Sequence, residues 1–438
     1  MLSSQATVEQ LLQLLPVVDE LETLRLAMIR TAVPDPGKAW DSSSSYATVD
    51  KRILAPEDVE AALTHAESSL REYVTLLHDG LRPVFRSYFS GDHEQAANHL
   101  LALGEHHEAM GRVRGASQCY NAALVLSLPL PEKASQIVAL RRLGRVMLSL
   151  GEFHDAISFY NRSVELASDT GDLRGEVIGR TGVGNVVMFQ GRWAEAERAY
   201  QQALQLAENA ADGSLRLEQG HLFNNLGNAH LRLSRLDEAD AWLERASALW
   251  DATETPEGLG TCYLNLGQLR AEQGRPADAR AAYEAALALP VPPALKSLLA
   301  GDMAELCLAE GHVTEAETLA RVAEEHAIAS SSPYTLGYMY RVRGNLARAL
   351  DHEDGFTFYE KALEIAREKG YPFLEAETLA DYGELRRRNG GAEEAVAYFE
   401  RARDMFAEQG AIREVARMES ALHELHTAVD ASMTAAGN

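Results

Sequence analysis

A small residue recurs about every 40 residues through most of this chain of 438 residues, and this period constrains the fold more than any other feature. Most recurrences have the same companions: glycine seven residues later, alanine twelve and nineteen residues later, and a large apolar residue sixteen residues later. A period of this length is the sequence signature of a stacked repeat. We call the recurring small residues the anchors, and they are Gly104, Gly144, Gly184, Gly227, Gly267, Ala304, Gly344 and Gly383.

One period predicts two antiparallel helices joined by a tight turn. Val138–Leu150 and Phe153–Ala167 each carry apolar residues at i, i+3, i+4 and i+7, the spacing of an amphipathic helix. Gly151 lies between them and can take the left-handed backbone that ends a helix. The anchor and the alanine twelve residues later let the two helix backbones approach. The large residue at sixteen is expected to fill the gap toward the next repeat.

This pattern resembles the tetratricopeptide repeat, and the resemblance covers residues 92–410. The period exceeds the usual length of about 34 residues, so the chain looks like the longer-helix variety found in spindle-orientation scaffolds and bacterial peptide-sensing regulators. Two repeats depart from the pattern: Ala304 and Ala320 replace a glycine and an aromatic in the sixth, and Asp351 replaces the turn glycine in the seventh. The clearest matches are Asn224–His230 with Ala239 and Ala246, and Tyr263–Gln268 with Gly274, Ala279, Tyr283 and Ala286.

The resemblance implies an all-α fold, a right-handed α-solenoid of about eight helix pairs in which stacked neighbours bury one continuous core. We expect the solenoid at 92–410, followed by a C-terminal capping helix and tail at 411–438. Residues 1–91 are expected to form an N-terminal helical extension with a polar linker near 33–52. The extension either covers the open end of the solenoid or acts as an interaction or homodimerisation element. Its expected helices are Leu11–Met28, Pro56–Leu77 and Leu81–Phe89.

The charge of the chain argues against several classes of function. The 65 acidic and 41 basic residues give a formal net charge of −24, which disfavours nucleic acids and anionic membrane surfaces as partners. No apolar run approaches the ~18 residues of a membrane span, and the first residues lack the pattern of a secretory signal. Cys119, Cys262 and Cys307 are too few and too widely spaced for a disulfide framework, so we interpret them as buried thiols of a cytoplasmic protein.

Signals of catalysis are poor, and we expect neither an enzyme nor a cofactor. The sequence contains no glycine-rich phosphate loop, nucleophile elbow or Cys-x-x-Cys pair. Histidines three or four residues apart on a helix can share a metal, and two groups, His93–His107 and His423–His426, offer such spacings. We interpret both groups as surface or packing histidines and predict no metal site. An enzyme built on the first group is the least favoured function.

The most informative polar residues lie on the first helix of each repeat. In the family these helices line the concave surface, and the resemblance implies that residues three before, one after and four or five after an anchor face into it. The predicted groove residues are Arg141, Arg145, Asn185, Asn224, Asn228, Arg232, Gln268, Arg341, Asn345 and Arg348. Few carboxylates accompany them from the second repeat to the fourth. The competing interpretation is that asparagine and arginine simply solvate an exposed helix face.

A row of carboxamides can pair with the N–H and C=O groups of an extended peptide, and arginines can bind acidic side chains or a terminal carboxylate. The sequence therefore predicts a non-enzymatic scaffold or adaptor with a protein or peptide partner. Its ligand would be an extended segment, acidic or C-terminal, in the concave groove. The alternative is a peptide-responsive bacterial signalling regulator whose N-terminal helices carry the output.

Overall fold

The computed structural model of the chain describes residues 80–81, 83–88, 90–210, 214–253, 255–352 and 354–436. The predicted extension at 1–91, with its linker near 33–52 and the helices at Leu11–Met28 and Pro56–Leu77, lies largely outside these residues. The homodimer predicted through those helices lies outside them as well. Residues 80–81 and 83–88 are helical, in agreement with the helix predicted at Leu81–Phe89.

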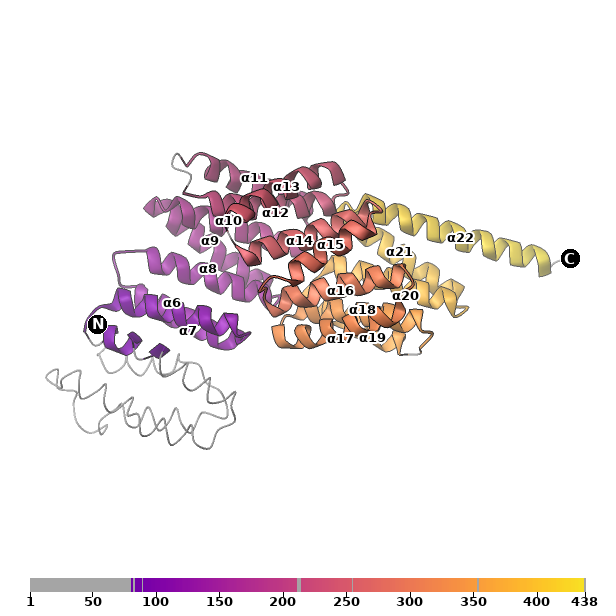
Figure 1. Cartoon of the computed structure of the whole chain (residues 1–438), viewed down its shortest axis with the longest axis horizontal. Coiled ribbons are helices and arrows are strands. Elements are labelled where there is room, and N and C mark those ends of the chain that lie inside the picture. The colour runs from indigo at the N-terminus through magenta and orange to yellow at the C-terminus, as the bar shows by residue number, and fades with distance from the viewer. Residues whose placement is uncertain are drawn as a thin grey trace, which may run out of the picture. The chain divides into compact units, whose positions relative to one another are not determined.

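Every regular element in the described part of the chain is an α-helix, and from His93 onward the helices follow one another as eight hairpin pairs and a final single helix (Figure 1). The prediction of an all-α solenoid of helix pairs is confirmed. Among the described helices, none has the length and apolar character needed to cross a membrane. The helices are α6 (His93–Ala109), α7 (Val113–Ser127), α8 (Ala134–Ser149), α9 (Phe153–Thr170), α10 (Leu173–Phe189), α11 (Trp193–Glu208), α12 (Arg216–Arg232), α13 (Leu236–Thr253), α14 (Pro256–Glu272), α15 (Pro276–Leu287), α16 (Pro293–Ala309), α17 (Val313–Ser330), α18 (Pro333–Ala349), α19 (Gly355–Lys369), α20 (Pro372–Arg388), α21 (Ala392–Gln409) and α22 (Ile412–Ala436).

The turn inside each pair depends on one left-handed residue, seven positions after the anchor. Glycine occupies this position in six pairs, with φ between 71° and 81°. Ser234 and Asp351 occupy it in the other two pairs and take the same backbone region, with φ of 60° and 55°. The same turn therefore forms where glycine is absent. In those two pairs the packing of the hairpin holds serine or aspartate in a left-handed conformation that residues with side chains rarely adopt.

The anchor is small because a large side chain of the second helix lies directly over it. A Cβ added at Gly184 would overlap the ring of Tyr200, and four other anchor glycines have an equivalent aromatic neighbour. These rings belong to the same helix pair as the anchor that they cover. The sequence predicts that these rings fill the gap toward the next repeat, and that contact is therefore only part of their packing. Tyr160 does make that contact, since its ring lies against Gly182 in the following pair.

The sixth pair, which lacks the glycine anchor and the aromatic, is completed by its neighbour. Tyr338 of α18 lies against Gly301 of α16. It also shares a hydrophobic core with Ala304 and Ala320, the two small residues that depart from the pattern. A ring from the following pair thus occupies the space that the missing aromatic would fill.

The chain divides into two compact modules. The second module holds Met147–Asn161 and the residues from Glu176 onward, and the first holds the remainder. The division crosses α8, α9 and α10. All of the predicted groove residues except Arg141 and Arg145 belong to the second module.

Within the second module, the turns of early helix pairs pack against the starts of late helices. Trp193 and Phe373 meet with ring centroids 5.1 Å apart. Lys369 Nζ donates to Glu152 Oε1 at 2.8 Å, across 217 positions of sequence. We call this contact the seam, and its residues are Glu152, Phe153, Phe189, Trp193, Arg232, Leu233, Glu272, Tyr334, Lys369, Tyr371, Phe373, Gly410 and Arg413.

Candidate functional site

The first helices of the second module carry two hydrogen-bonded groups of polar side chains. One group is a row of asparagines that joins α10, α12 and α14. Asn225 Nδ2 donates to Asn185 Oδ1 at 3.0 Å, and Asn265 Nδ2 donates to Asn224 Oδ1 at 2.8 Å. Asn224 Nδ2 donates to Asn225 Oδ1 at 3.4 Å and connects the two pairs. We call these four residues the amide row, and it ties together the first helices of three successive pairs.

Two of the predicted asparagines also bind a tyrosine of their own helix pair. Tyr200 donates its hydroxyl hydrogen to Asn185 Oδ1 at 2.8 Å, and Tyr359 donates to Asn345 Oδ1 at 2.7 Å. Both asparagines directly follow an anchor, and both tyrosine rings cover that anchor. Asparagine at this position therefore has a structural cause besides any ligand, because it satisfies a hydroxyl group that packing holds beside it.

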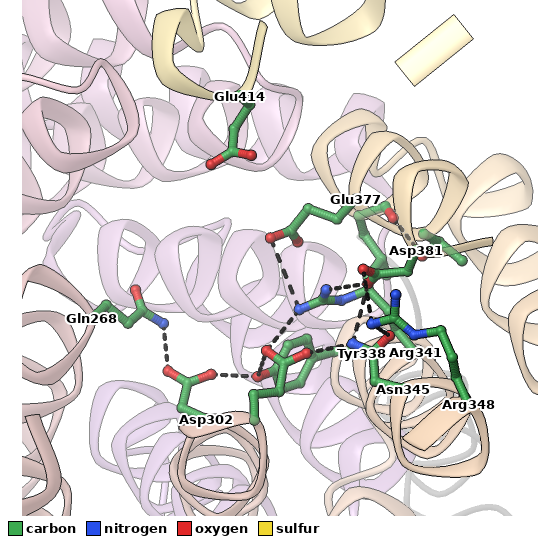
Figure 2. A network of polar contacts seen from close by, with 12 residues as sticks. Gln268, Asp302, Tyr338, Arg341, Asn345, Arg348, Glu377, Asp381 and Glu414 are labelled. Atoms are coloured by element: carbon green, nitrogen blue, oxygen red, sulfur yellow. Dashed lines mark hydrogen bonds and ion pairs between the residues drawn. The ribbon is translucent and has the colours of Figure 1, made fainter. Parts of the chain in front are cut away.

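The second group is a network of charged and polar side chains that point toward one another from α14, α16, α18 and α20 (Figure 2). Arg341 lies at its centre, 2.9 Å from Glu305, 2.7 Å from Asp381 and 3.9 Å from Glu377. The Arg341 side chain is only 9% exposed. We call this group the charged network, and it consists of Gln268, Asp302, Glu305, Tyr338, Arg341, Asn345, Arg348, Glu377 and Asp381.

Asp302 is held in the network by neutral groups. Gln268 Nε2 donates to one of its oxygens at 2.8 Å, and the Tyr338 hydroxyl donates to the other. Burial raises the pKa of Asp302 to about 6, although these two hydrogen bonds act in the opposite direction. A carboxyl group with this pKa takes up a proton just below neutral pH, well above the range of an ordinary aspartate.

The arginines of the network stabilise the other carboxylates to different degrees. Burial raises the pKa of Glu305 and of Glu377, while the positive charge of Arg341 opposes the rise. Burial alone would also raise the pKa of Asp381, but the charges of Arg341 and Arg348 lower it below its usual value. The arginines therefore stabilise the ionised form of Asp381. At Glu305 and Glu377 the effect of burial, which disfavours the ionised form, is larger than the effect of Arg341.

Two predicted residues on α12 are less engaged with the rest of the chain. The guanidinium of Arg232 lies over the ring of Phe373, 4.8 Å from its centroid, and forms no ion pair with any carboxylate that the structure describes. Its positive charge acts at longer range and lowers the pKa of Asp302 and of Glu377, against the effect of burial. Asn228 Oδ1 is buried and has no hydrogen-bond partner among the described atoms. A buried acceptor without a donor is costly. Because residues four apart share one helix face, α12 presents a cation beside an unused acceptor.

The remaining predicted residues have partners within the chain. In the second module, Arg348 donates to Asn345 Oδ1 at 3.4 Å and lies 3.9 Å from Asp381. In the first module, Arg145 forms an ion pair with Glu108 at 2.5 Å. Arg145 and Arg141 lie on α8 in that module, and their assignment to a groove stays a prediction.

Sequence reasoning misses the carboxylates of the charged network. Glu305 directly follows the anchor Ala304, at the position that holds asparagine or glutamine in four other repeats. The signal is present in the sequence, because Glu305 follows a recognised anchor, but a carboxylate does not fit the pattern of asparagine and arginine from which the groove residues are predicted. Asp302 and Asp381 each lie two residues before an anchor, a position outside the three offsets expected to face inward.

The histidines and cysteines give no second site. His107 is fully buried, as the packing interpretation predicts, and burial lowers its pKa to about 4. All three cysteines are buried as well. In the described ranges, no group of three or more histidine, cysteine, aspartate or glutamate side chains is placed to hold a metal ion.

Comparison with sequence families identifies the repeat. A profile described as tetratricopeptide repeat matches residues 95–169, 218–290 and 331–408. The chain belongs to the tetratricopeptide repeat family. Further profiles with the same description match residues 264–333 and 182–214. The resemblance drawn from the anchors is therefore confirmed over nearly the whole range expected for the solenoid. No curated protein matches the chain.

Several solved structures are similar to this tetratricopeptide repeat chain at low sequence identity. BtubC from P. vanneervenii is 18% identical with a TM-score of 0.42, over 50% of this chain and 90% of that one. A Rap protein complexed with competence and sporulation factor is 12% identical with a TM-score of 0.44, over 93% and 99% of the two chains. The Rap conjugation gene regulator of plasmid pLS20, in complex with the Phr* peptide, is 14% identical with a TM-score of 0.47, over 83% and 94%. Likeness at this level carries no conclusion about function.

Proposed function

We propose that this tetratricopeptide repeat protein is a non-enzymatic interaction scaffold, working in the cytoplasm, that binds an extended peptide segment along the inner helices of its second module. The observation that carries the proposal is the polar lining of α10 to α20, in which amides, arginines and carboxylates follow one another from helix to helix. An extended chain offers N–H and C=O groups at regular intervals. A lining with both donors and acceptors can satisfy them, and solenoids commonly bind ligands on such a face.

Arg232 and Asn228 supply the first contacts of the proposed ligand. Arg341 and Arg348 already have carboxylate neighbours within the chain. An acidic side chain or the C-terminal carboxylate of the ligand would therefore bind Arg232, which forms no ion pair with a described residue, although its charge acts at longer range on Asp302 and Glu377. Asn228 Oδ1, one helical turn earlier, would accept a backbone N–H of the same segment.

Peptide display provides the test. A random dodecapeptide library with a free chain end is selected against the full chain, and the affinity of the selected peptides is measured for wild type, Arg232→Ala and Asn228→Ala. Each substitution should weaken binding about tenfold or more, because a hydrogen bond to a charged group contributes about 1.5–3 kcal/mol and an unmet buried group costs about as much. Amidation of the peptide's C-terminus tests the carboxylate contact separately.

Arg235→Ala is the matched control. Arg235 lies three residues after Arg232, but its guanidinium forms an ion pair with Glu197 at 3.0 Å. Its removal should leave affinity unchanged. If no peptide is selected, or if Arg232→Ala and Asn228→Ala bind as tightly as wild type, the proposed groove is wrong.

The alternative, a peptide-responsive bacterial regulator, depends on N-terminal helices that lie outside the described residues, so it stays a prediction. X-ray scattering of the full chain with and without a selected peptide separates the two functions. A passive scaffold keeps its dimensions when the peptide binds, whereas the regulator changes them.

A further inference from the structure

The inner helices of the second module form a closed ring. The amide row joins α10 to α12 and α12 to α14. The charged network continues the circuit from α14 to α16, from α16 to α18 and from α18 to α20. The seam completes it, because Phe373 at the start of α20 contacts Trp193 at the start of α11 and Arg232 at the end of α12.

The seam is packed like a core. Trp193 and Tyr371 are each 2% exposed. Trp193 and Leu233 belong to the same hydrophobic cluster as the buried residues of α19 to α22. Phe153 belongs to a second cluster, which contains Tyr371 as well. The two sides of the seam therefore share their apolar cores and do not merely touch.

Ion pairs flank this apolar contact. Glu152 pairs with Lys369 at one end of the seam, and Glu272 pairs with Arg413 at the other. The packed contacts of the seam thus extend between these two ion pairs.

The inside of the ring stays polar and reachable by water. The side chains of Asp381, Glu377 and Glu305 retain exposed fractions of 15%, 22% and 28%. They line the inner faces of α16 and α20, so the charged network is not covered by apolar side chains. A chain that enters the ring would meet charged groups still in contact with solvent.

We propose that the groove is loaded from its ends, so that its ligand is a protein segment with a free chain end. This inference rests on the proposed function and names the class of partner. A free end can thread into a closed ring. An internal segment, held between two folded domains, can reach the inner helices only if the seam opens, and the seam buries too much aromatic surface to open readily.

Two display libraries test the inference. In the first, a random dodecapeptide ends the displayed chain. In the second, the same dodecapeptide lies between two folded domains and is joined to them by flexible linkers. Every selected sequence is then measured in both contexts against the full chain. The free-ended form should bind at least about tenfold more tightly than the inserted form.

Stapling the seam distinguishes threading from opening. Glu152→Cys with Lys369→Cys, and Glu272→Cys with Arg413→Cys, place one thiol pair at each end of the seam. A short bismaleimide joins each pair, and the native cysteines are protected because all are buried. The matched control is the same variant capped with N-ethylmaleimide. Free-ended peptides should bind the stapled and the capped forms with equal affinity.

The outcomes separate the inference from the proposed function. If inserted and free-ended peptides bind equally, the groove is loaded from the side and the inference fails while the scaffold remains. If stapling abolishes the binding of free-ended peptides, the ligand passes through an open seam and the inference again fails. If neither library yields a binder, the proposed function fails and the inference fails with it.

Discussion

At the scale of single residues, the charged network depends on one guanidinium. Arg341 lies within 3 Å of both Glu305 and Asp381, and its positive charge also opposes the rise that burial causes in the pKa of Glu377. Its side chain is almost fully covered by the protein. Arg341 has largely left water, so its carboxylate neighbours are its main compensation, although those carboxylates remain 15–28% exposed.

Arg341→Leu should therefore lower the free energy of unfolding by about 3 kcal/mol at neutral pH, since it leaves three partly buried carboxylates without their cation. Arg321→Leu is the matched control. Arg321 pairs with Glu325 where both side chains are about two-thirds exposed, and such pairs contribute little. Urea denaturation measures both variants, and equal effects would show that the network is only a set of surface pairs.

Asp302 should make stability depend on pH in a defined direction. Its pKa in the folded chain, about 6, lies above the ordinary 3.8, so the folded state binds this proton more tightly than the unfolded state. The resulting stabilisation is complete below the ordinary pKa and is lost as the pH rises through about 6. Asp302→Asn is neutral at every pH.

The stability of Asp302→Asn relative to wild type should fall as the pH is lowered from about 7 to about 5, because wild type gains a proton over this range. Urea denaturation at several pH values measures the difference. The amide that replaces the carboxyl group faces two hydrogen-bond donors, which lowers the stability of the variant by the same amount at every pH. Only the change of the stability difference with pH therefore reports the proton on Asp302. A difference that does not vary over this range would refute the assignment.

Offsets within the repeat place residues on the first helix of a pair, but they do not predict the partners of those residues. Arg341 and Asn345 are selected by their offsets to the anchor Gly344, and both lie on α18, the first helix of its pair. Their bonds to Glu305 are not predictable from offsets, since contacts between helices of neighbouring repeats depend on the rotation of each helix against the next. The chemistry of the charged network is therefore less basic than the row of arginines suggests.

At the scale of the helix pair, local pattern predicts the structure well. The anchor, the turn position and the small residue at twelve set the hairpin, and the hairpin forms even where Ser234 or Asp351 stands at the left-handed turn. Packing direction is harder to predict. A ring sixteen residues after the anchor can lie over its own anchor or against the following pair, and Tyr200 and Tyr160 show the two cases.

Gly184→Ala should lower the free energy of unfolding by about 1–3 kcal/mol, because the added methyl group overlaps the Tyr200 ring and the two helices must separate. Gly355→Ala is the control, since the nearest atom to its added Cβ is the end of the Leu385 side chain at 3.2 Å, which can move. Thermal unfolding of both variants measures the effect. Comparable stability of the two would mean that the anchor does not set the helix approach.

At the scale of the whole molecule, the repeat pattern predicts that successive helix pairs stack, but it does not predict that early and late pairs meet at the seam. The path of a solenoid accumulates from small rotations at each repeat, and no periodic signal links residues 217 positions apart, such as Glu152 and Lys369. A weak trace exists in hindsight. Phe153 and Trp193 are aromatic residues nine positions after their anchors, and both pack in the seam of the second module.

Amide hydrogen exchange of the full chain, with and without a selected free-ended peptide, tests the central claim most directly. A ligand bound on the inner helices should slow exchange on α12, α14, α16, α18 and α20 and leave the second helices of the same pairs unchanged. Slower exchange confined to α13, α15, α17 and α19, or spread equally over both sets, would contradict a peptide-binding groove.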